Sequence, residues 1–273
     1  MILHKRYTPN DHTFVICAYG KSKYLTECIE SIMGQTVRGN VLLFTSTPNE
    51  HISGLAEKYG IRLITGEVSK GIASDWNHAY ESGETELVTI AHQDDVYYQN
   101  YLEETLKHIN RSKAPMISFS GYYELHEDRT VTDRDFINLR IKKIMLSPLA
   151  IKRLQRSRWL RRRILSLGNP ICCPSVTYVK RNLPERVFEE GLISNLDWAA
   201  WETISRRDGS FVYIPKALMS HRIYGESVTT KTIQCGARTK EDYAMLKRFW
   251  PSPIAKLINA IYSKSQKSRL SQD

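Results

Sequence analysis

Short apolar runs alternate with segments of helical periodicity along the first half of the chain. The runs are rich in β-branched side chains, which is typical of buried strands. The intervening segments carry apolar residues three and four positions apart, as on one face of a helix. The expected strands are residues 13–19, 41–44, 61–65, 87–91 and 115–123, with a helix in each interval. This order predicts an α/β fold with a mostly parallel sheet and helices on both faces.

The second half of the chain is less regular. Its apolar runs predict three further strands and its periodic segments predict helices around them. The expected strands are residues 176–179, 211–214 and 217–219. The expected helices begin near residue 195 and cover residues 239–250 and 253–264.

Two adjacent carboxylates, Asp94 and Asp95, follow the central apolar run. Ligands of open α/β sheets bind at the carboxyl ends of the strands. Two carboxylates there repel each other unless a cation lies between them. A divalent cation that carries a diphosphate takes such hard oxygen ligands. A pair that only caps the next helix is the structural alternative, and the pattern alone favours neither.

The net charge indicates an anionic partner. The chain has 273 residues, enough for one large domain or a domain with a subdomain, and its apolar and charged fractions are ordinary for a soluble protein. Its formal charge is +10 and its pI is about 9.3. Nucleic acid, anionic lipid and nucleotide-diphosphate compounds are all partners of suitable charge.

The cysteines and the amino-terminal residues predict a reduced cytoplasmic protein. The cysteines are odd in number and form no CxxC pair, so a disulfide framework or a zinc site is not expected. No signal peptide is expected, and no apolar run is long enough to span a bilayer. The cysteines are Cys17, Cys28, Cys172, Cys173 and Cys235.

Residues 136–167 form a basic segment with apolar residues at helical spacing, interrupted at Pro148. No Asp or Glu occurs between Asp135 and Glu185. Such a helix can lie in the interface of an anionic membrane, with its cations near the headgroups. Two alternatives stay open: a helical pair packed on the protein's own core, and cations that bind a diphosphate directly.

Five stretches in this order resemble a family 2 glycosyltransferase of the bacterial cell-surface polysaccharide type, which has the Rossmann-like GT-A fold. The resemblance covers residues 13–230, and its specificity lies in order and spacing. The stretches are residues 17–20, 71–77, 92–95, 195–198 and 221–222. The implied division is a nucleotide-sugar-binding half (1–135), a basic amphipathic helical segment (136–167), an acceptor-binding half (168–230) and C-terminal helices (231–273).

The resemblance implies that a sugar moves, with inversion, from a nucleotide-diphosphate donor to a saccharide acceptor, lipid-linked in some relatives. The expected donor is a UDP-sugar. A divalent ion, Mn or Mg, stabilises the charge that grows on the leaving diphosphate. The expected metal residues are Asp94, Asp95 and His221, although a His after a strand is also a common structural hydrogen-bonder. The family usually has Asp where His92 stands, and Arg222 is either a phosphate partner or a surface charge.

Asp197 matches the Asp of the family's Glu-Asp motif, with Leu196 in place of the Glu. The match implies a base that deprotonates the acceptor hydroxyl. A helix N-terminal carboxylate is the structural alternative. Trp198 and Trp201 are expected to pack on the acceptor sugar, and Glu202 is the alternative base.

The donor pocket is expected at the loop after the first strand, where Gly20 allows close backbone approach. The family usually has an Asp after the second strand, and here Thr45 begins a turn without a carboxylate. Asp75 either faces the ribose or diphosphate or caps its helix. The expected donor-binding residues are Ala18, Tyr19, Gly20, Thr45, Asp75, His92, Gln93 and Asp94.

Two other functions compete with sugar transfer. A nucleic-acid-binding protein would explain the charge, but the basic residues are concentrated in one segment without a recognised motif. A metal-dependent nucleotidyltransferase would carry a glycine-rich basic phosphate loop, which residues 20–23 match poorly. We therefore expect no nucleic-acid partner, and an enzyme that is cytoplasmic and peripheral at the inner face of the plasma membrane.

Overall fold

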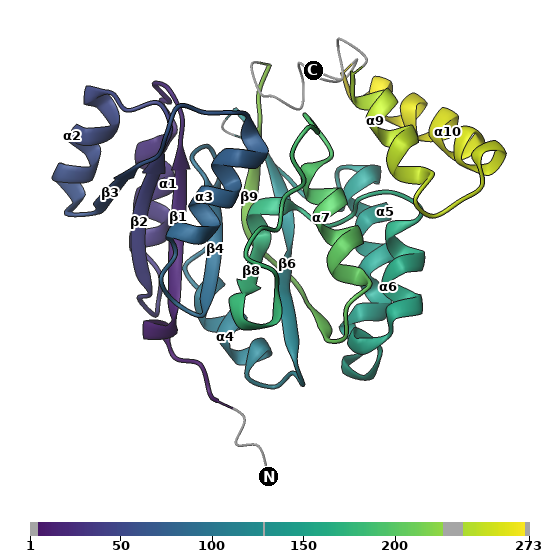
Figure 1. Ribbon diagram of the computed structural model, residues 1–273, viewed down its shortest axis with the longest axis horizontal. Coiled ribbons are helices and arrows are strands. Elements are labelled where there is room, and N and C mark those ends of the chain that lie inside the picture. The colour runs from purple at the N-terminus through teal and green to yellow at the C-terminus, as the bar shows by residue number, and fades with distance from the viewer. Residues whose placement is uncertain (1–4, 128, 226–236, 271–273) are drawn as a thin grey trace.

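A computed structural model describes residues 5–127, 129–225 and 237–270, and one sheet runs through it (Figure 1). Its strand order is β3-β2-β1-β4-β8-β6-β9-β5, and β7 pairs with β6. The strands are β1 (His12–Ala18), β2 (Asn40–Thr45), β3 (Arg62–Thr65), β4 (Leu87–His92), β5 (Val96–Tyr97), β6 (Pro115–His126), β7 (Arg129–Val131), β8 (Val176–Val179) and β9 (Ser210–Ile223).

The helices fall where the periodic segments predict them. Those of the first half are α1 (Leu25–Met33), α2 (Glu50–Tyr59), α3 (Ile72–Ser82) and α4 (Tyr101–Ile109). Those of the second half are α5 (Ile137–Leu146), α6 (Arg158–Leu165), α7 (Leu196–Ser205), α9 (Ala237–Leu246) and α10 (Ser252–Leu270).

Most of the strand pairs in the amino-terminal half are parallel, as predicted. β1 lies between β2 and β4 and is parallel to both, and β2 is parallel to β3. β8 pairs antiparallel with β4 on one side and with β6 on the other, and the pairs β6–β7 and β5–β9 are antiparallel too. One sheet therefore crosses the boundary predicted at residue 135. The boundary predicted at residue 230 lies outside the described residues, as does Cys235, while the other four cysteines are free thiols.

Two hydrophobic cores cover the two faces of the sheet. Phe14 and Ile16 of β1 enter one core with α1 and α4, whereas Val15 enters the other with α3 and α7. Successive residues of a strand point to opposite faces, so a fully apolar run is the pattern of a strand covered on both sides. The predicted α/β class with helices on both faces is confirmed.

The strands predicted at residues 211–214 and 217–219 are one strand, β9. Its register against β6 slips between Ser120 and Gly121, which leaves Pro215 and Lys216 as a bulge. Proline cannot donate to the ladder, and a bulge bends a strand without ending it. A Cβ at Gly121 would meet the carbonyl oxygen of Lys216 at 3.1 Å, so glycine suits this close approach.

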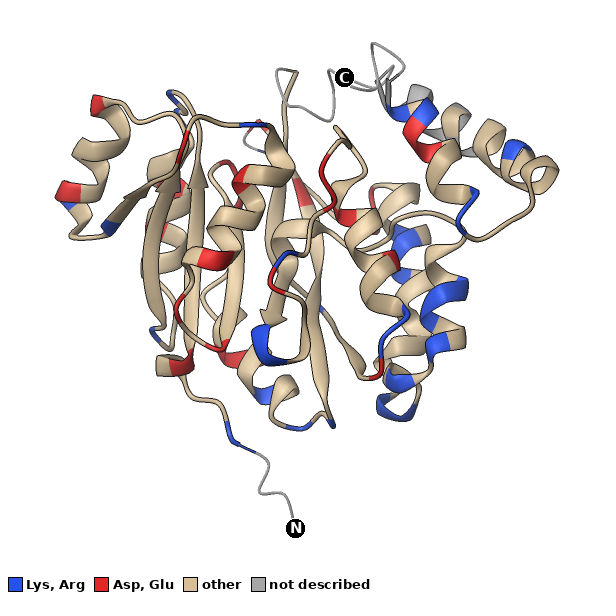
Figure 2. Cartoon of the chain, viewed as in Figure 1, with Lys and Arg blue, Asp and Glu red and all other residues tan. Residues whose placement is uncertain are grey.

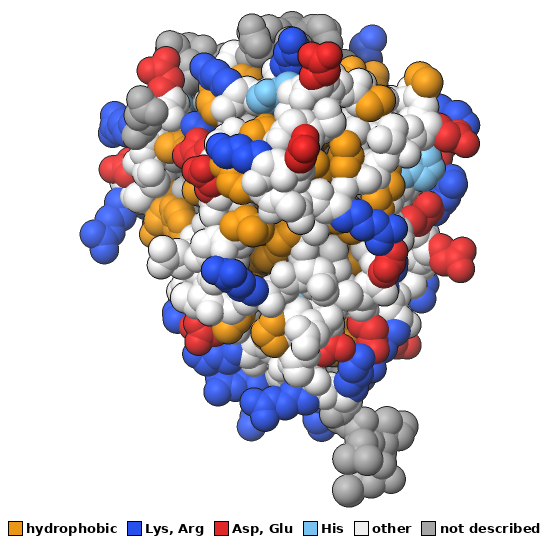
Figure 3. Space-filling model, turned by 90° about the vertical axis from the view of Figure 1, so that its left-hand side faces the viewer, with side chains coloured by type: hydrophobic (Ala, Val, Ile, Leu, Met, Phe, Trp, Pro, Cys, Tyr) orange, Lys and Arg blue, Asp and Glu red, His pale blue; other side chains and the backbone are white. Residues whose placement is uncertain are grey.

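The basic segment folds as α5 and α6, joined by 3-10 turns at Ser147–Ala150 and Lys152–Arg156, and the predicted break at Pro148 is confirmed. α6 packs on α7, and the turns pack on β9. Figure 2 shows Lys and Arg gathered over α5 and α6, whereas Figure 3 shows charges of both signs interspersed on the side of α2 and β3. None of the described helices is long and apolar enough to cross a bilayer.

Arg161 of α6 is a structural residue. Its side chain is buried and donates to the carbonyl oxygens of Ser205 (2.8 Å), Gly209 (2.7 Å) and Arg207, just after α7. Burial lowers the pKa of Arg161 to about 10. The guanidinium therefore pairs carbonyls that would otherwise be orphaned at the end of a helix.

Replacing Arg161 with methionine is expected to lower the free energy of unfolding by about 3 kcal/mol, because several buried carbonyls lose their donor. Arg153→Met, at an exposed arginine of the same segment, is the matched control and should stay within about 0.5 kcal/mol of wild type. Urea titration measures both values. Equal, small effects would contradict a structural role for Arg161.

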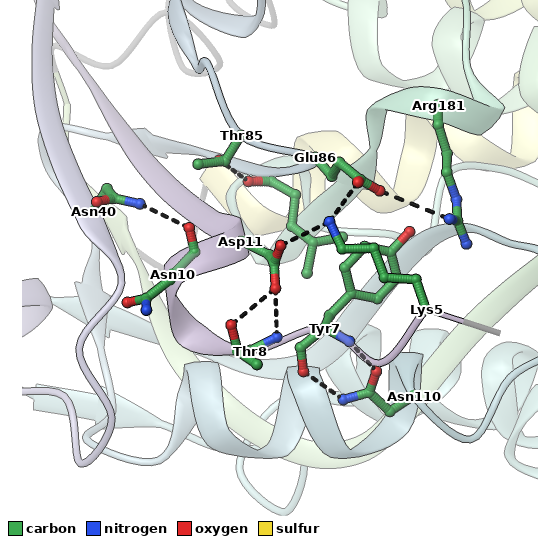
Figure 4. Close-up of polar contacts among 11 residues, drawn as sticks. Lys5, Tyr7, Thr8, Asn10, Asp11, Asn40, Thr85, Glu86, Asn110 and Arg181 are labelled. Atoms are coloured by element: carbon green, nitrogen blue, oxygen red, sulfur yellow. Dashed lines mark hydrogen bonds and ion pairs between the residues drawn. The ribbon is translucent and has the colours of Figure 1, made fainter. Parts of the chain in front are cut away.

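The amino-terminal segment is bound to the end of the sheet where β1 and β4 begin (Figure 4). Lys5 Nζ lies 2.9 Å from Asp11 Oδ1 and 2.5 Å from Glu86 Oε1. The backbone of Tyr7 exchanges two hydrogen bonds with the Asn110 amide, at 2.7 and 2.8 Å. These groups fix the amino ends of the strands, and the polar cluster described next lies at the carboxyl ends.

Candidate active site

The Asp pair lies in a turn at the carboxyl end of β4, as predicted. β4 ends at His92, the Asp95 N–H donates to the His92 carbonyl at 3.2 Å, and β5 follows at Val96. In the parallel register His92 lies beside Cys17 of β1, so the loop after β1 borders this turn. This is the edge of an α/β sheet at which ligands bind.

β9 contacts the turn of residues 92–96, called the Asp turn below, on the side opposite the loop after β1. Asp95 is fully buried, and its Oδ1 accepts from His221 Nδ1 and from the Arg222 N–H, both at 2.9 Å. Arg222 Nε donates to the Asp94 carbonyl at 2.9 Å, and its guanidinium pairs with Glu27. Arg222 is thus buried and stabilises the turn. The two roles predicted for it, phosphate partner and surface charge, were wrong.

His92, Asp94 and Asp95 fit a divalent cation. Among the described residues, one ligand atom from each lies within 4.8 Å of the others. His92 Nε2 and Asp95 Oδ2 are buried and have no hydrogen-bond partner among these residues, which is costly unless a ligand supplies one. Burial and the Asp95 charge raise the pKa of Asp94. Carboxylate ligands suit Mg²⁺ or Mn²⁺, and imidazole is a common ligand of transition-metal ions.

The two histidines differ in their surroundings. His92 stacks on Trp76, with ring centroids 4.8 Å apart, and burial lowers the pKa of His92, which favours the neutral imidazole that binds metals. Burial alone would lower the pKa of His221, but the Asp95 carboxylate raises it above its usual value. His221 is hydrogen-bonded to Asp95, one member of the group that fits the cation. Its role as a metal ligand stays a prediction.

The loop after β1 is fixed by side chains from its neighbours. Gln93 accepts from the Tyr19 N–H at 2.9 Å and donates to the Tyr19 carbonyl at 3.0 Å. Gly20 has a φ of +58°, and its N–H donates to Thr47 Oγ1 at 2.8 Å. Gln93 therefore orients the loop through its amide, while the exposed Tyr19 ring stays available to a ligand.

Asp75 of α3 lies against the turn after β2. Its Oδ2 accepts from Ser46 Oγ at 3.0 Å and from Ser69 Oγ at 2.8 Å, while Oδ1 is buried and without a hydrogen-bond partner. Asp75 accordingly does not cap its helix, and it brings a carboxylate to the turn that begins at Thr45 and lacks one of its own. Ala18 and Thr45 are buried, and Thr45 Oγ1 accepts from the Thr47 N–H.

Asp197 stands in the first turn of α7 with its carboxylate held in place. Its Oδ1 accepts from the Trp198 N–H at 2.8 Å and its Oδ2 from Asn169 Nδ2 at 2.7 Å. The side chain is partly exposed. Burial raises the pKa of Asp197, while the charges of Arg238 and Lys142 act in the opposite direction. A raised pKa suits a carboxylate that accepts a proton.

The neighbours of Asp197 on α7 face the core. Trp198 is fully buried and donates to the Leu165 carbonyl at 3.0 Å, and Trp201 is fully buried and stacks on Tyr178. The rings cannot pack on an acceptor sugar, so that prediction is corrected. Glu202 is also buried, and its Oε1 pairs with Arg162 at 2.6 Å and Arg206 at 2.8 Å, which leaves no role as a base.

The cations near Asp197 were not predicted from the sequence. Lys142 Nζ donates to the Tyr122 hydroxyl at 2.8 Å, and the Tyr122 ring lies edge-on to His221. Lys142 shares the inner side of α5 with Leu146, four positions on, and this spacing is the signal that could have found it. Arg238 of α9 has a buried Nε without a hydrogen-bond partner among the described residues, and no local pattern marks it.

Glu241 of α9 anchors the loop that leads into α7. Its carboxylate accepts from the N–H groups of Ile193 (2.7 Å), Ser194 (2.9 Å) and Asn195 (3.0 Å). Asp242 next to it accepts from the Asn195 amide at 2.7 Å. The C-terminal helices therefore help to set the position of Asp197, two residues after Asn195.

A cavity of about 370 Å³ adjoins this side of the site. Tyr122 and Lys142 belong to its lining, together with Lys143 of α5 and the bulge of β9. Tyr122 thus contacts His221, and Lys142, which is bonded to Tyr122, interacts electrostatically with Asp197. Both residues also line the cavity.

Residues 13–188 match the sequence profile described as "Glycosyl transferase family 2", which is more than half of the chain. The chain belongs to glycosyl transferase family 2. This family 2 chain is 26% identical over 144 residues to glycosyltransferase GlyG of Streptococcus pneumoniae serotype 4 (strain ATCC BAA-334 / TIGR4). The match covers 48% of either chain, so the chain spans about half the length of this curated relative.

Solved structures share the fold of the family 2 chain. S. aureus TarS (residues 1–349) in complex with UDP-GlcNAc superposes with a TM-score of 0.59 at 15% identity, covering 92% of this chain and 71% of that one. The mannosyltransferase PcManGT of Pyrobaculum calidifontis, in complex with GDP-Man and Mn²⁺, gives 0.61 at 16%, covering 93% and 69%. These likenesses confirm the predicted GT-A fold.

Proposed function

We propose that this family 2 chain is an inverting, metal-dependent glycosyltransferase that moves a sugar from a nucleotide-diphosphate donor to a saccharide acceptor. The observation that carries the proposal is the group His92, Asp94 and Asp95 at the end of β4, which fits a divalent cation and in which His92 and Asp95 each have a buried atom without a hydrogen-bond partner among the described residues. TarS with UDP-GlcNAc and PcManGT with GDP-Man and Mn²⁺ support a nucleotide-sugar donor and a metal. A UDP-sugar is our first choice of donor.

The donor half would be residues 1–135 and the acceptor half residues 168–230. Tyr19 and Gly20 border the proposed donor pocket, Asp75 supplies its carboxylate, and Asp94 with His92 would hold the ion. When bound, the ion neutralises the charge that grows on the leaving diphosphate. Burial of Asp95 keeps water away from its carboxylate and strengthens the electrostatic interactions of that group.

Asp197 would accept the proton of the attacking acceptor hydroxyl. Asn169 and the Trp198 N–H orient its carboxylate, and Lys142 and Arg238 favour its ionised form. A single displacement inverts the anomeric carbon, because the base and the leaving group act on opposite sides of it. The cavity beside Tyr122 and Lys142 is the space that we assign to the acceptor.

We place this reaction in cell-surface polysaccharide synthesis on the cytoplasmic side, with a saccharide or lipid-linked saccharide acceptor. The test is a panel of UDP- and GDP-sugars with Mn²⁺ and a set of saccharide acceptors. We expect one donor to release its nucleoside diphosphate together with a glycosylated product of inverted anomeric configuration, which NMR detects. A product of retained configuration would contradict the proposed single displacement. Release of pyrophosphate from nucleoside triphosphates would favour a nucleotidyltransferase instead.

Lys142→Met is expected to move the acidic limb of the kcat–pH profile to higher pH. Burial raises the pKa of Asp197 and Lys142 partly offsets this, so removal of the cation raises that pKa further. A protonated carboxyl cannot accept a proton, and kcat therefore falls at a higher pH than in wild type. Lys113→Met, at an exposed lysine that does not line the cavity, is the matched control and should leave the limb in place. Identical limbs in Lys142→Met and wild type would contradict the assignment.

A further inference from the structure

The outer side of α5 is apolar although it faces away from the core. Ile137, Ile141 and Ile144 are 60%, 48% and 63% exposed and recur at spacings of four and three, which places them in one stripe. Leu139 and Leu146 are buried, and at 100° per residue they lie on the opposite side of the helix. α5 is therefore apolar on two opposite faces, and the described residues of this chain cover only one.

Cations accompany this stripe. Lys152, Arg153 and Arg156, in the turn after α5, are exposed and form no ion pair, hydrogen bond or ring contact with the described residues. Ile151, beside them, is also exposed. Arg140 is exposed on α5 itself, three residues after Ile137 and four before Ile144. The surface thus combines apolar side chains with cations that have no carboxylate to pair with.

The arginines of α6 divide into structural and exposed residues. Arg161 is buried under the carbonyls that follow α7, and Arg162 pairs with Glu202. Arg163 is exposed, and its guanidinium lies over the rings of Trp159 and Trp250. The exposed cations of this segment whose side chains have no partner among the described residues therefore lie in residues 152–156. A triple change at Arg161, Arg162 and Arg163 would damage the fold.

We propose that the stripe Ile137–Ile141–Ile144, together with Lys152, Arg153 and Arg156, docks the protein on an anionic membrane surface. The isoleucines would enter the headgroup boundary while the cations pair with anionic headgroups. Charge complementarity favours an anionic membrane as the partner of this surface. No Asp or Glu lies between Asp135 and Glu185, and Figure 2 shows only Lys and Arg coloured along α5 and α6. This surface is independent of the proposed sugar transfer.

Two other occupants fit the surface less well. In a symmetric pair of chains the same patch meets itself, so the cations of both copies would repel each other. A single-stranded nucleic acid would satisfy the cations, but its binding relies on aromatic platforms, and the stripe offers isoleucines. Both occupants are outcomes of the experiment that follows.

Co-sedimentation with vesicles tests the proposal. Wild-type protein should bind vesicles that contain phosphatidylglycerol, with binding that rises with the anionic fraction and falls with salt. Replacing Lys152, Arg153 and Arg156 with Gln should lower the partition coefficient about 10²-fold at low salt. Replacing the three isoleucines with Ser should also abolish sedimentation, by removing the apolar contact.

Arg38→Gln, Lys58→Gln and Arg111→Gln together are the matched control, since they remove the same charge from exposed positions elsewhere. This control should keep at least most of the binding. No sedimentation with highly anionic vesicles at low salt would overturn the proposal, as would an equal loss in the control. Preferred binding to single-stranded RNA, or a dimer that the isoleucine changes dissociate, would overturn it too. Unchanged melting temperatures of the Gln variants show that folding is not the cause.

Discussion

Chelation of divalent ions is expected to lower the rate of sugar transfer by about 10³-fold, because a bound ion supplies several kcal/mol of transition-state stabilisation. Mn²⁺ or Mg²⁺ added back should restore the rate. Asp94→Asn should reproduce the loss and resist rescue, since its carboxylate belongs to the group that fits the ion. Initial rates with and without EDTA measure both effects.

The matched control for Asp94 is Asp208→Asn. Asp208 is a highly exposed carboxylate after α7, and this change should leave the metal-dependent rate unaltered. Circular dichroism should show both variants folded. Full activity of the wild type in excess EDTA would contradict the assignment of the ion to the Asp turn.

Asp197→Asn is expected to lower kcat at least about 10²-fold, the usual scale for a positioned base. The amide keeps the size of the side chain and can still accept from the Trp198 N–H, but it cannot take a proton. Donor affinity should be close to wild type, because the donor pocket is assigned to other residues. Steady-state kinetics and nucleoside-diphosphate binding separate the two quantities.

Glu202→Gln is the matched control for Asp197, because Glu202 is the other carboxylate of α7. It is buried between Arg162 and Arg206, so we expect a lower melting temperature and a kcat within a few-fold of wild type. A loss of donor affinity in Asp197→Asn with kcat unchanged would assign Asp197 to the binding site instead.

The elements of the fold could be predicted because their signals are local. Apolar runs and helical spacing marked the strands and helices of the first half, and the turn at Asp94 follows from a strand end. The strand pairing of β8 between β4 and β6 could not be predicted, since an antiparallel insertion leaves no local pattern. In the sequence, the proline of the bulge, Pro215, could not be told apart from the end of a strand, so β9 was predicted as two strands.

The site was predicted where single motifs carry it and missed where distant segments meet. α7 is apolar nearly all round, so its sequence does not show that Trp198 and Trp201 point inward. Arg238 and Glu241 reach the Asp197 region from α9, some 40 residues further along the chain. Contacts at such separation depend on tertiary packing, which residue spacing does not encode.

Asp75 was predicted as a donor-binding residue, but only the fold reveals its contact with the turn after β2. Its carboxylate reaches from α3 to Ser46, in the turn after β2 where the family usually has an Asp. Sequence comparison position by position finds the carboxylate missing from the turn. The packing of α3 against β2 places the Asp75 carboxylate at this turn.

Thermal shift with nucleoside diphosphate and Mn²⁺ tests the central claim most directly, since ligand binding stabilises the folded state. At about 100 times Kd, UDP or GDP with Mn²⁺ should raise the melting temperature by about 5 °C, and neither compound should do so in EDTA. Asp94→Asn should lose the shift and Asp197→Asn should keep it. A shift that is independent of the metal and of Asp94, or a larger one with nucleoside triphosphates or RNA, would contradict the account.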